Sequence, residues 1–329
     1  MLKSTSKIAA HQRKWYGKWH TWAGIFAGSI LLIVTLTGAL LVYERELDEW
    51  FYQDSFTFHD TGGKRLTFQE VHDKVMEQRP DWEIGGVFEY NDSQKAYSMF
   101  LFHQNLQVIV DPYTGLITSE RVYAKTVMGF IRKLHRTLLI PTWGKYIVGI
   151  ASLLMVSLMV TGLRLWIPRK WKYVKKRLTI KRGVGFKRQN YDFHNILGFY
   201  FSPVIALLAL TGVAITFAQY VIIALFIAGL TPPESIESIL GRQSIYQEGV
   251  KPLTIDEVVA KGAMEIPGGK VRGVSLPHDS AGVYQVSITA PGPSKAGVAS
   301  LISFDQFSGE RVMSTHHDFA LLGKLYLNW

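Results

Sequence analysis

The sequence predicts a bundle of membrane-spanning helices joined to two small α+β modules outside the membrane, and three observations lead to this class. Of the 329 residues, 48% are hydrophobic, a share unusual for a soluble chain of this length. Three apolar stretches are long enough to cross a hydrocarbon core of about 30 Å, which takes about 20 helical residues. The long segments that follow the first and third stretches repeat each other's signals, which indicates an internal duplication.

The three predicted spans are Trp22–Tyr43, Tyr146–Ile167 and Ile196–Leu230. The first apolar run exceeds the roughly 7 to 15 residues of a signal-peptide core, so we expect it to remain as an anchor. The third run has 35 residues. Because that length corresponds to a straight helix of about 50 Å, the run is expected to tilt, to kink at Pro203 or to emerge outside the membrane.

Positive charge is concentrated on two short segments, although the net charge of the whole chain is +10. Five Lys or Arg residues precede the first span and eleven lie within 164–188, with no acidic residue in either segment. Short basic loops stay in the cytoplasm, whereas long segments are translocated largely regardless of charge. The N-terminus is therefore predicted inside and the two long segments outside. We interpret 164–188 as a solvated cytoplasmic loop rather than a lipid or nucleic-acid site.

Each long segment begins with a helix signal and continues with short strands. Thr67 with Glu70, and Thr254 with Glu257, are capping boxes that predict helix starts. Alternating or apolar runs then predict strands. These runs are Glu83–Tyr90, Ala96–His103, Leu106–Val110 and a strand from Leu116 in the first segment, and Lys270–Leu276, Val283–Thr289 and Ala299–Phe304 in the second. One helix and about four antiparallel strands therefore form a module that occurs twice.

A histidine opens the first span and another opens the third, and small residues follow both at the same spacing. Gly38 lies 18 residues after His20 within a Thr-Gly pair, and Gly212 lies 18 residues after His194 in another. Eighteen helical residues make five turns, so each glycine lies on the face of its histidine. Two further glycines, Gly24 and Gly198, lie one turn along nearly the same stripe. An imidazole beside a stripe without bulky side chains leaves room for a large flat group, which we interpret as haem.

The duplication also makes a prediction about the end of the chain. Asp111 and Asp305 open matching turns, and His135 lies 24 residues after Asp111. The position 24 residues after Asp305 is Trp329, where the sequence stops. We therefore expect the partner of His135 and a fourth span beyond this end.

The chain has no cysteine, which excludes disulfides, thiolate metal sites and iron–sulfur clusters within it.

These residues resemble the PepSY-associated transmembrane proteins, a family that includes iron-siderophore reductases of the bacterial inner membrane. The matching motifs are Trp19–Gly24 with Leu36–Leu40, Leu134–Leu139 with Thr161–Trp166, and Asp192–Gly198 with Leu210–Gly212. The two outside modules look like PepSY domains. The resemblance implies two b-type haems with bis-histidine ligation, which carry electrons outward to ferric chelates. It also implies a last helix with a further histidine, which this sequence lacks, so the second ligand of the outer haem stays open.

The predicted boundaries follow the chain in order. They are a cytoplasmic N-terminus (1–21), a first span (22–43), a periplasmic PepSY-like module (44–130), an interfacial helix with the second span (131–167), a basic cytoplasmic loop (168–193), a third span (194–230) and a second periplasmic PepSY-like module (231–329).

His20 and His194 both begin outward-running helices, so they are expected at the same depth, facing each other across one haem. His135 is expected near the outer interface, where Arg136 and its basic neighbours would suit haem propionates or, alternatively, anchor lipid head groups. His316 and His317 are alternative ligands, or residues that line the substrate surface. One nitrogen of each ligand imidazole would remain to bond an acceptor that fixes the ring, and the sequence leaves that acceptor open. Three threonines next to glycines are expected to bond back to their own helices, namely Thr37, Thr161 and Thr211.

Two functions of different classes fit these observations. The first is a haem b oxidoreductase that reduces ferric siderophore in the periplasm and so releases ferrous iron. Its electron donor would be quinol or a separate cytoplasmic protein, because no dinucleotide fingerprint or P-loop is present. The rival is a non-catalytic membrane-anchored protein whose modules bind or regulate an envelope component. A bilayer is a partner of both, nucleic acid of neither, and the oligomeric state stays open.

Overall fold

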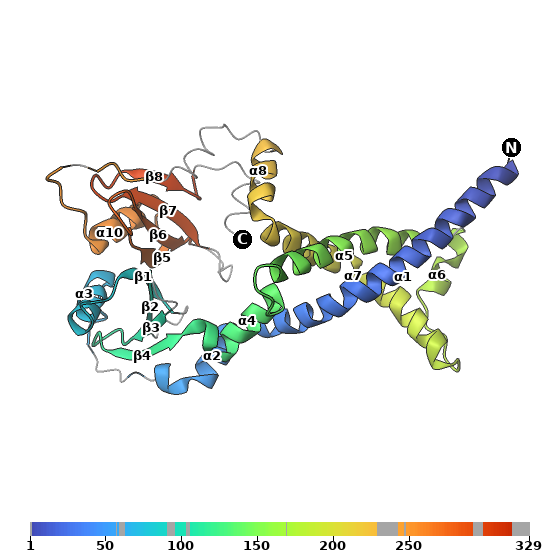
Figure 1. Ribbon diagram of the computed structural model, residues 1–329, viewed down its shortest axis with the longest axis horizontal. Helices are drawn as coiled ribbons and strands as arrows, with labels where there is room; N and C mark the ends of the chain where they lie inside the picture. The colour runs from blue at the N-terminus through green and yellow to red at the C-terminus, as the bar shows by residue number, and fades with distance from the viewer. Residues whose placement is uncertain are drawn as a thin grey trace. The chain divides into compact units, whose positions relative to one another are not determined.

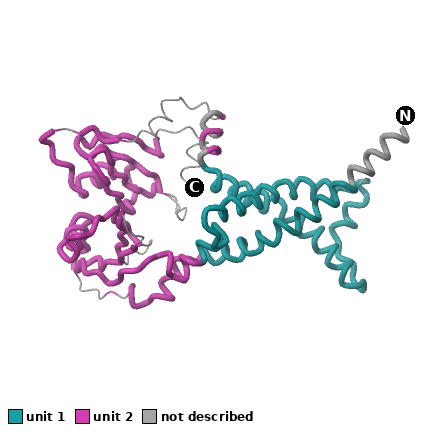
Figure 2. The backbone as a smooth tube through the Cα atoms, in the orientation of Figure 1, with its two compact units in different colours: residues 1–42, 131–219 teal, residues 43–130, 220–329 magenta. Residues whose placement is uncertain are grey.

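The computed structural model describes residues 2–56, 58, 63–90, 96–102, 106–168, 170–228, 243–246, 248–291 and 299–317. The chain divides into two compact units, coloured separately in Figure 2. The first, called here the membrane unit, consists of Met1–Val42 and Ile131–Gln219, and the second, called the sheet unit, consists of Tyr43–Phe130 and Tyr220–Trp329.

Three long helices make up most of the membrane unit (Figure 1). They are α1 (Leu2–Leu41), α5 (Gly144–Trp166) and α7 (Phe186–Thr216), and α5 packs against both of the others. Each contains a stretch apolar and long enough to cross a membrane, and in α1 that stretch is Lys14–Leu41. The prediction of three long apolar helices is confirmed, and the chain is a multi-pass membrane protein.

The third long helix runs through the proline of the long apolar run. α7 continues through Pro203 and ends at Thr216, and α8 (Ala218–Ala228) begins after Phe217. Pro203 has no N–H for the carbonyl of Phe199, but the hydroxyl of Ser202 donates to that oxygen at 2.8 Å. The substitute donor explains why the proline does not end the helix. The last two residues of the predicted run, 229–230, lie outside the described residues.

The helix that contains His135 is separated from α5 by a tight corner. α4 (Val127–Thr137) ends where Leu138 and Leu139 adopt left-handed backbone angles, with φ of 51° and 60°. A side chain at Gly144, the first residue of α5, would begin 1.8 Å from the carbonyl oxygen of Thr137. Glycine is therefore required at this close approach. The segment between the two helices, which includes Pro141, is therefore a break in the helical chain.

The basic segment between α5 and α7 closes the end of α5. It contains η3 (Trp171–Tyr173) and α6 (Val174–Arg177). The guanidinium of Arg177 donates to the carbonyls of Leu165 at 3.0 Å and Trp166 at 2.5 Å. A cation at a helix C-terminus satisfies carbonyls that have no partner within the helix.

The sheet unit contains one eight-stranded antiparallel sheet in the order β4-β3-β2-β1-β5-β6-β7-β8. Its strands are β1 (Ile84–Glu89), β2 (Tyr97–Leu101), β3 (Leu106–Val110), β4 (Ile117–Val122), β5 (Lys270–Ser275), β6 (Val283–Thr289), β7 (Ser300–Asp305) and β8 (Arg311–Ser314). Two helices, α3 (Phe68–Gln78) and α10 (Ile255–Glu265), accompany it. The short helices α2 (Glu44–Phe51), η1 (Gln53–Phe56) and η2 (Tyr123–Lys125) also belong to this unit.

Both modules begin and turn as their sequences predict. The capping boxes at Thr67 and Thr254 are confirmed, because each threonine accepts the N–H three residues on and its glutamate accepts the N–H of the cap. Asp111 and Asp305 each accept the N–H groups two and three residues on, which fixes the matching turns. Valines of α3 and α10 pack into one apolar core with the strands, so both helices cover the same face of the sheet.

The sequence did not predict that the two modules share one sheet. β1 pairs with β5, and the partners include Val87 with Val274 and Phe88 with Gly273. The helices are also linked, because the N–H of Ile255 donates to the side chain of Gln69 at 2.8 Å. The two modules therefore form one folded body within the sheet unit. A hydrogen-bonded sheet of this kind cannot continue through a bilayer as an open structure.

A buried ion pair fastens α2 to the first module. Arg121 of β4 and the hydroxyl of Tyr90 both contact the carboxylate of Asp48 at 2.5 Å, and the Asp48 side chain is only 3% exposed. Burial, followed by the bond to Asp48, raises the pKa of Tyr90. Arg121 also lies over the rings of Tyr52 and Phe56. This cluster holds the segment that follows α1 against the edge strand of the sheet.

Removing the arginine of this cluster should destabilise the sheet unit far more than removing an exposed one. Arg121→Met leaves the Asp48 charge buried without its partner, so we expect the free energy of unfolding to fall by about 3–5 kcal/mol. The matched control is Arg79→Met, because the Arg79–Glu120 pair is partly exposed and should contribute about 1 kcal/mol or less. Unfolding of the full chain in detergent, followed by circular dichroism, measures both. Equal losses in the two variants would show that the buried cluster is not special.

Candidate histidine sites in the membrane unit

His20 lies on α1 and is held by a Thr-Gly pair of the neighbouring helix α5. Its Nδ1 atom is 3.1 Å from the hydroxyl oxygen of Thr161. A side chain at Gly162, the next residue, would begin 3.0 Å from Cε1 of the same ring. Thr161 thus contacts one edge of the imidazole by a hydrogen bond, and Gly162 leaves the space that the ring occupies.

The ring of His194 on α7 lies beside the ring of His20. Their centroids are 6.2 Å apart and their planes are inclined by 67°. His194 is exposed, whereas His20 is half-buried between α1 and α5. The structure therefore brings together the two histidines that the matched sequence frames singled out.

His135 on α4 uses the same kind of contact with α1. Its Nδ1 atom is 3.2 Å from the hydroxyl oxygen of Thr37 and 2.9 Å from the carbonyl oxygen of Val34. A side chain at Gly38 would begin 3.0 Å from Cε1 of His135. Within the described part of the membrane unit, no second imidazole contacts this ring.

The glycines of the predicted stripe have different neighbours from one another. Gly38 borders the ring of His135 and not that of His20, although it shares a helix with His20. A side chain at Gly24 would meet Leu158 at 3.9 Å, one at Gly212 would meet the hydroxyl of Ser152 at 2.9 Å, and one at Gly198 would meet nothing within 4 Å. Gly24 and Gly212 therefore lie at helix contacts with α5, and Gly198 borders open space.

Of the remaining predicted residues, Arg136 and His317 are exposed and His316 is half-buried. Arg136 follows His135 on α4 and is exposed. His316 and His317 lie in the sheet unit after β8, with ring centroids 4.6 Å apart. Nε2 of His317 is 3.1 Å from the carbonyl oxygen of Glu265. The expected partner of His135 beyond Trp329 and the residues 318–329 lie outside the described residues.

A family model for the PepSY-associated TM region matches residues 18–277. The chain belongs to this family. The matched range contains His20, His135 and His194, two of the candidate spans in full, and the first span from residue 18 onward. A comparison with curated proteins found no match.

The sequence did not predict that Thr161 contacts His20 or that Thr37 contacts His135. Membership of the PepSY-associated family does not identify these two threonines either. The expected bonds back to their own helices are present, because Thr161 donates to Ser157 and Thr37 donates to Ile33. The missed feature is that each hydroxyl also meets an imidazole of another helix. The signal was the repeated Thr-Gly dipeptide itself, but the sequence does not show which helices are neighbours.

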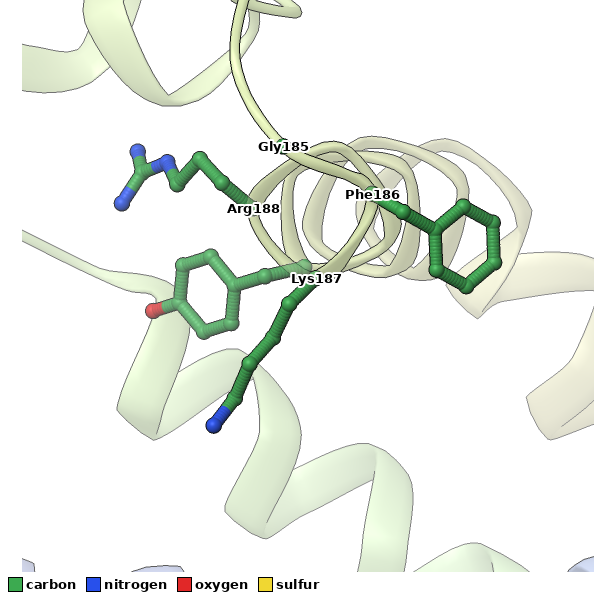
Figure 3. A pocket seen from close by; sticks show the side chains of 5 residues that line it. Gly185, Phe186, Lys187 and Arg188 are labelled. Carbon is green, nitrogen blue, oxygen red and sulfur yellow. The ribbon is translucent and has the colours of Figure 1, made fainter.

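Two hollows of this PepSY-associated protein are lined by residues other than His20, His135 and His194. The first, of about 600 Å³, is lined by residues of a single stretch at the start of α7, which Figure 3 shows with Phe186 on one side and Lys187 on another. Mixed aromatic and cationic side chains are typical of a membrane interface. The second, of about 550 Å³, is a cleft of the sheet unit lined by His72, Glu83 and Phe102 of the first module and by His278, Tyr284 and Gln306 of the second.

Filling the space beside His20 should destabilise the membrane unit. Gly162→Leu places a side chain where the His20 ring lies, and such overpacking typically costs about 1–3 kcal/mol. Gly198→Leu is the matched control, since it makes the same change within a span but meets nothing within 4 Å. We expect a lower thermal unfolding midpoint in detergent for Gly162→Leu alone. A fall of the same size in the control would contradict the contact.

Proposed function

We propose that the chain is a haem b electron carrier of the bacterial inner membrane that passes electrons outward and reduces ferric iron held by a siderophore in the periplasm. The observation that carries the proposal is the His20–His194 ring pair between two membrane helices. Ionisable groups at membrane depth are costly and usually functional. Membrane anchoring alone does not explain why two histidines at matched positions lie side by side in a membrane protein.

The spacing of the two rings fits bis-histidine ligation. Metal–imidazole bonds are about 2.0–2.1 Å long and the ring nitrogen lies about 1.1 Å from the ring centre, so two imidazoles on opposite sides of one metal ion have centroids about 6.4 Å apart. The observed separation is 6.2 Å. Haem iron is commonly held by imidazole, and the angle between the ring planes is free to vary about each metal–nitrogen bond. His20 and His194 are therefore the residues that would hold the inner haem.

A second site at the other end of α1 supports transfer across the membrane. His20 lies on α1, and Gly38 of the same helix borders the ring of His135. At about 1.5 Å per residue, 18 residues correspond to about 27 Å, close to the hydrocarbon thickness of about 30 Å. His135 would hold the second haem, and its exposed neighbour Arg136 provides a positive charge for propionate groups.

The protein's own part in the reaction is ligation, burial and positioning. Haem, when bound, supplies reversible one-electron chemistry that amino-acid side chains lack. One electron from quinol or a cytoplasmic protein balances the reduction of one Fe³⁺ to Fe²⁺, and the hard oxygen ligands of a siderophore hold Fe²⁺ less tightly. His20 and His194 would hold the haem at the inner end of the path, and His135 would hold the haem at the outer end.

The sheet unit provides a surface on which a chelate can dock. Because β1 pairs with β5, both of its modules would lie on one side of the membrane, and the basic segments flanking α1 and α7 favour the cytoplasm for the opposite side. The cleft lined by His72 and His278 has a volume of about 550 Å³, within the range of about 300–1,000 Å³ typical of small-molecule sites. We propose this cleft as the chelate-binding site.

The haem proposal predicts that the purified full chain is red. Its dithionite-reduced spectrum should be that of low-spin haem b. His20→Ala and His194→Ala should each remove the same haem, because both rings are needed to grip it, whereas His135→Ala should remove the other. The matched control is His278→Ala in the sheet unit, which should leave the haem content unchanged. Colourless, folded protein would refute the proposal and favour a membrane-anchored binding or regulatory protein.

The substrate proposal predicts electron transfer to a ferric chelate. Protein reduced beforehand and mixed anaerobically with ferric siderophore should reoxidise, and a ferrous-iron indicator should report one Fe²⁺ per electron lost. The iron-free siderophore is the control and should leave the haem reduced. If the haem stays reduced in the presence of the ferric chelate, the proposal that ferric siderophore is the substrate is refuted, and the haem proposal is unaffected.

A further inference from the structure

The hydroxyl groups of Thr161 and Thr37 each have their hydrogen committed to their own helix. Oγ1 of Thr161 donates to the carbonyl of Ser157 at 2.9 Å, and Oγ1 of Thr37 donates to that of Ile33 at 2.7 Å. A carbonyl oxygen only accepts, and a hydroxyl has one hydrogen. Each threonine oxygen therefore faces its neighbouring imidazole as an acceptor.

This commitment determines which nitrogen of each imidazole carries the proton. Nδ1 of His20 lies 3.1 Å from Oγ1 of Thr161, so Nδ1 is the donor. Nδ1 of His135 lies 2.9 Å from the carbonyl oxygen of Val34, which leaves no alternative to a proton on Nδ1. A neutral imidazole has one N–H. In both residues the lone pair is consequently on Nε2.

We propose that Thr161 and Thr37 are positioning residues, which fix the Nδ1–H form of His20 and His135 and so present Nε2 as the nitrogen that ligates haem iron. The ligand role in this inference rests on the proposed function. A hydrogen-bond acceptor for the nitrogen that does not bind the metal orients a ligating imidazole and raises its basicity. The glycine after each threonine completes the arrangement by leaving room for the Cε1 edge of the ring.

The arrangement occurs twice with different helices. α5 supplies the Thr-Gly pair for His20 of α1, and α1 supplies the Thr-Gly pair for His135 of α4. In both, the hydroxyl contacts Nδ1 and the glycine borders Cε1 at the same 3.0 Å. An incidental packing contact would not reproduce the same two atoms in the same relation at two independent sites.

The two sites differ in one respect that a mutation can reveal. His20 has Thr161 as the acceptor for its Nδ1 among the described residues, whereas His135 has both Thr37 and the carbonyl of Val34. A side-chain substitution removes a hydroxyl but not a backbone carbonyl. Thr161→Val should therefore leave Nδ1 of His20 without its acceptor. After Thr37→Val, Nδ1 of His135 should still bond to the carbonyl of Val34.

The test compares Thr161→Val with Thr161→Ser in the full chain, since valine keeps the shape and serine keeps the hydroxyl. In chain labelled with ¹⁵N in the histidine rings and prepared without haem in lipid nanodiscs, His20 should show the Nδ1–H form in wild type and Thr161→Ser. In Thr161→Val it should show a mixture of the two forms. The signal of His135 should not change in either variant, which makes it an internal control.

The haem-loaded protein gives the second measurement. Loss of the acceptor makes His20 a poorer donor to ferric iron, so Thr161→Val should raise the midpoint potential of the inner haem and weaken its binding by about 10- to 100-fold. It should also alter the electron paramagnetic resonance signal that reports the ring orientation. Thr161→Ser should keep the midpoint potential, the haem affinity and the resonance signal close to those of the wild type. Thr37→Val should change these properties of the outer haem less than Thr161→Val changes those of the inner haem.

Each part of the proposal can fail separately. Wild-type His20 in the Nε2–H form, or an Nδ1–H form that persists in Thr161→Val, would overturn the positioning role. Chain that binds no haem but shows the expected ring signals would refute the proposed function and the ligand role, and would leave the hydrogen-bond assignment standing. Haem signals unaffected by Thr161→Val would overturn the link between the threonine and the ligand.

Discussion

An imidazole placed among membrane helices has to find its hydrogen-bond partner inside the bundle, because lipid tails offer none. The membrane unit meets this constraint twice with a threonine and the glycine that follows it. The constraint also selects which helices touch: α5 approaches α1 where Thr161 meets His20, and α4 approaches α1 where Thr37 meets His135. α1 contributes to both contacts, one as histidine donor and one as threonine acceptor. α1 therefore takes part in both histidine–threonine contacts and links the two histidine sites of the membrane unit.

The sheet unit applies the duplication differently. Its two halves each supply a capped helix and four strands, but neither keeps a separate sheet, because β1 and β5 pair at the centre. The symmetric strand order places the duplicated Asp turns in corresponding positions on either side of that pair. The cleft that includes His72 and His278 takes residues from both halves. Neither half alone could therefore form this cleft.

Local patterns predicted most of the elements, and non-local pairings account for what was missed. Apolar length identified the three spans, and the capping boxes at Thr67 and Thr254 identified two helix starts, because both signals lie within a few residues. The matched frames singled out His20 and His194, whose rings the structure brings to 6.2 Å. Helical periodicity placed Gly38 on the face of His20 but could not show that the ring filling its space is His135. Strand order across the modules is likewise set by contacts between distant residues.

The joint between β1 and β5 also governs how the protein is made. Phe88 and its partner Gly273 are 185 residues apart, and both α5 and α7 are synthesised between them. Closing so long a loop is slow, and it cannot begin before the second half emerges. Until then β1 is the bare edge of a half-finished sheet, the kind of surface that captures stray strands. Nascent chains that stall between the two halves should therefore be the form of this protein most prone to aggregate.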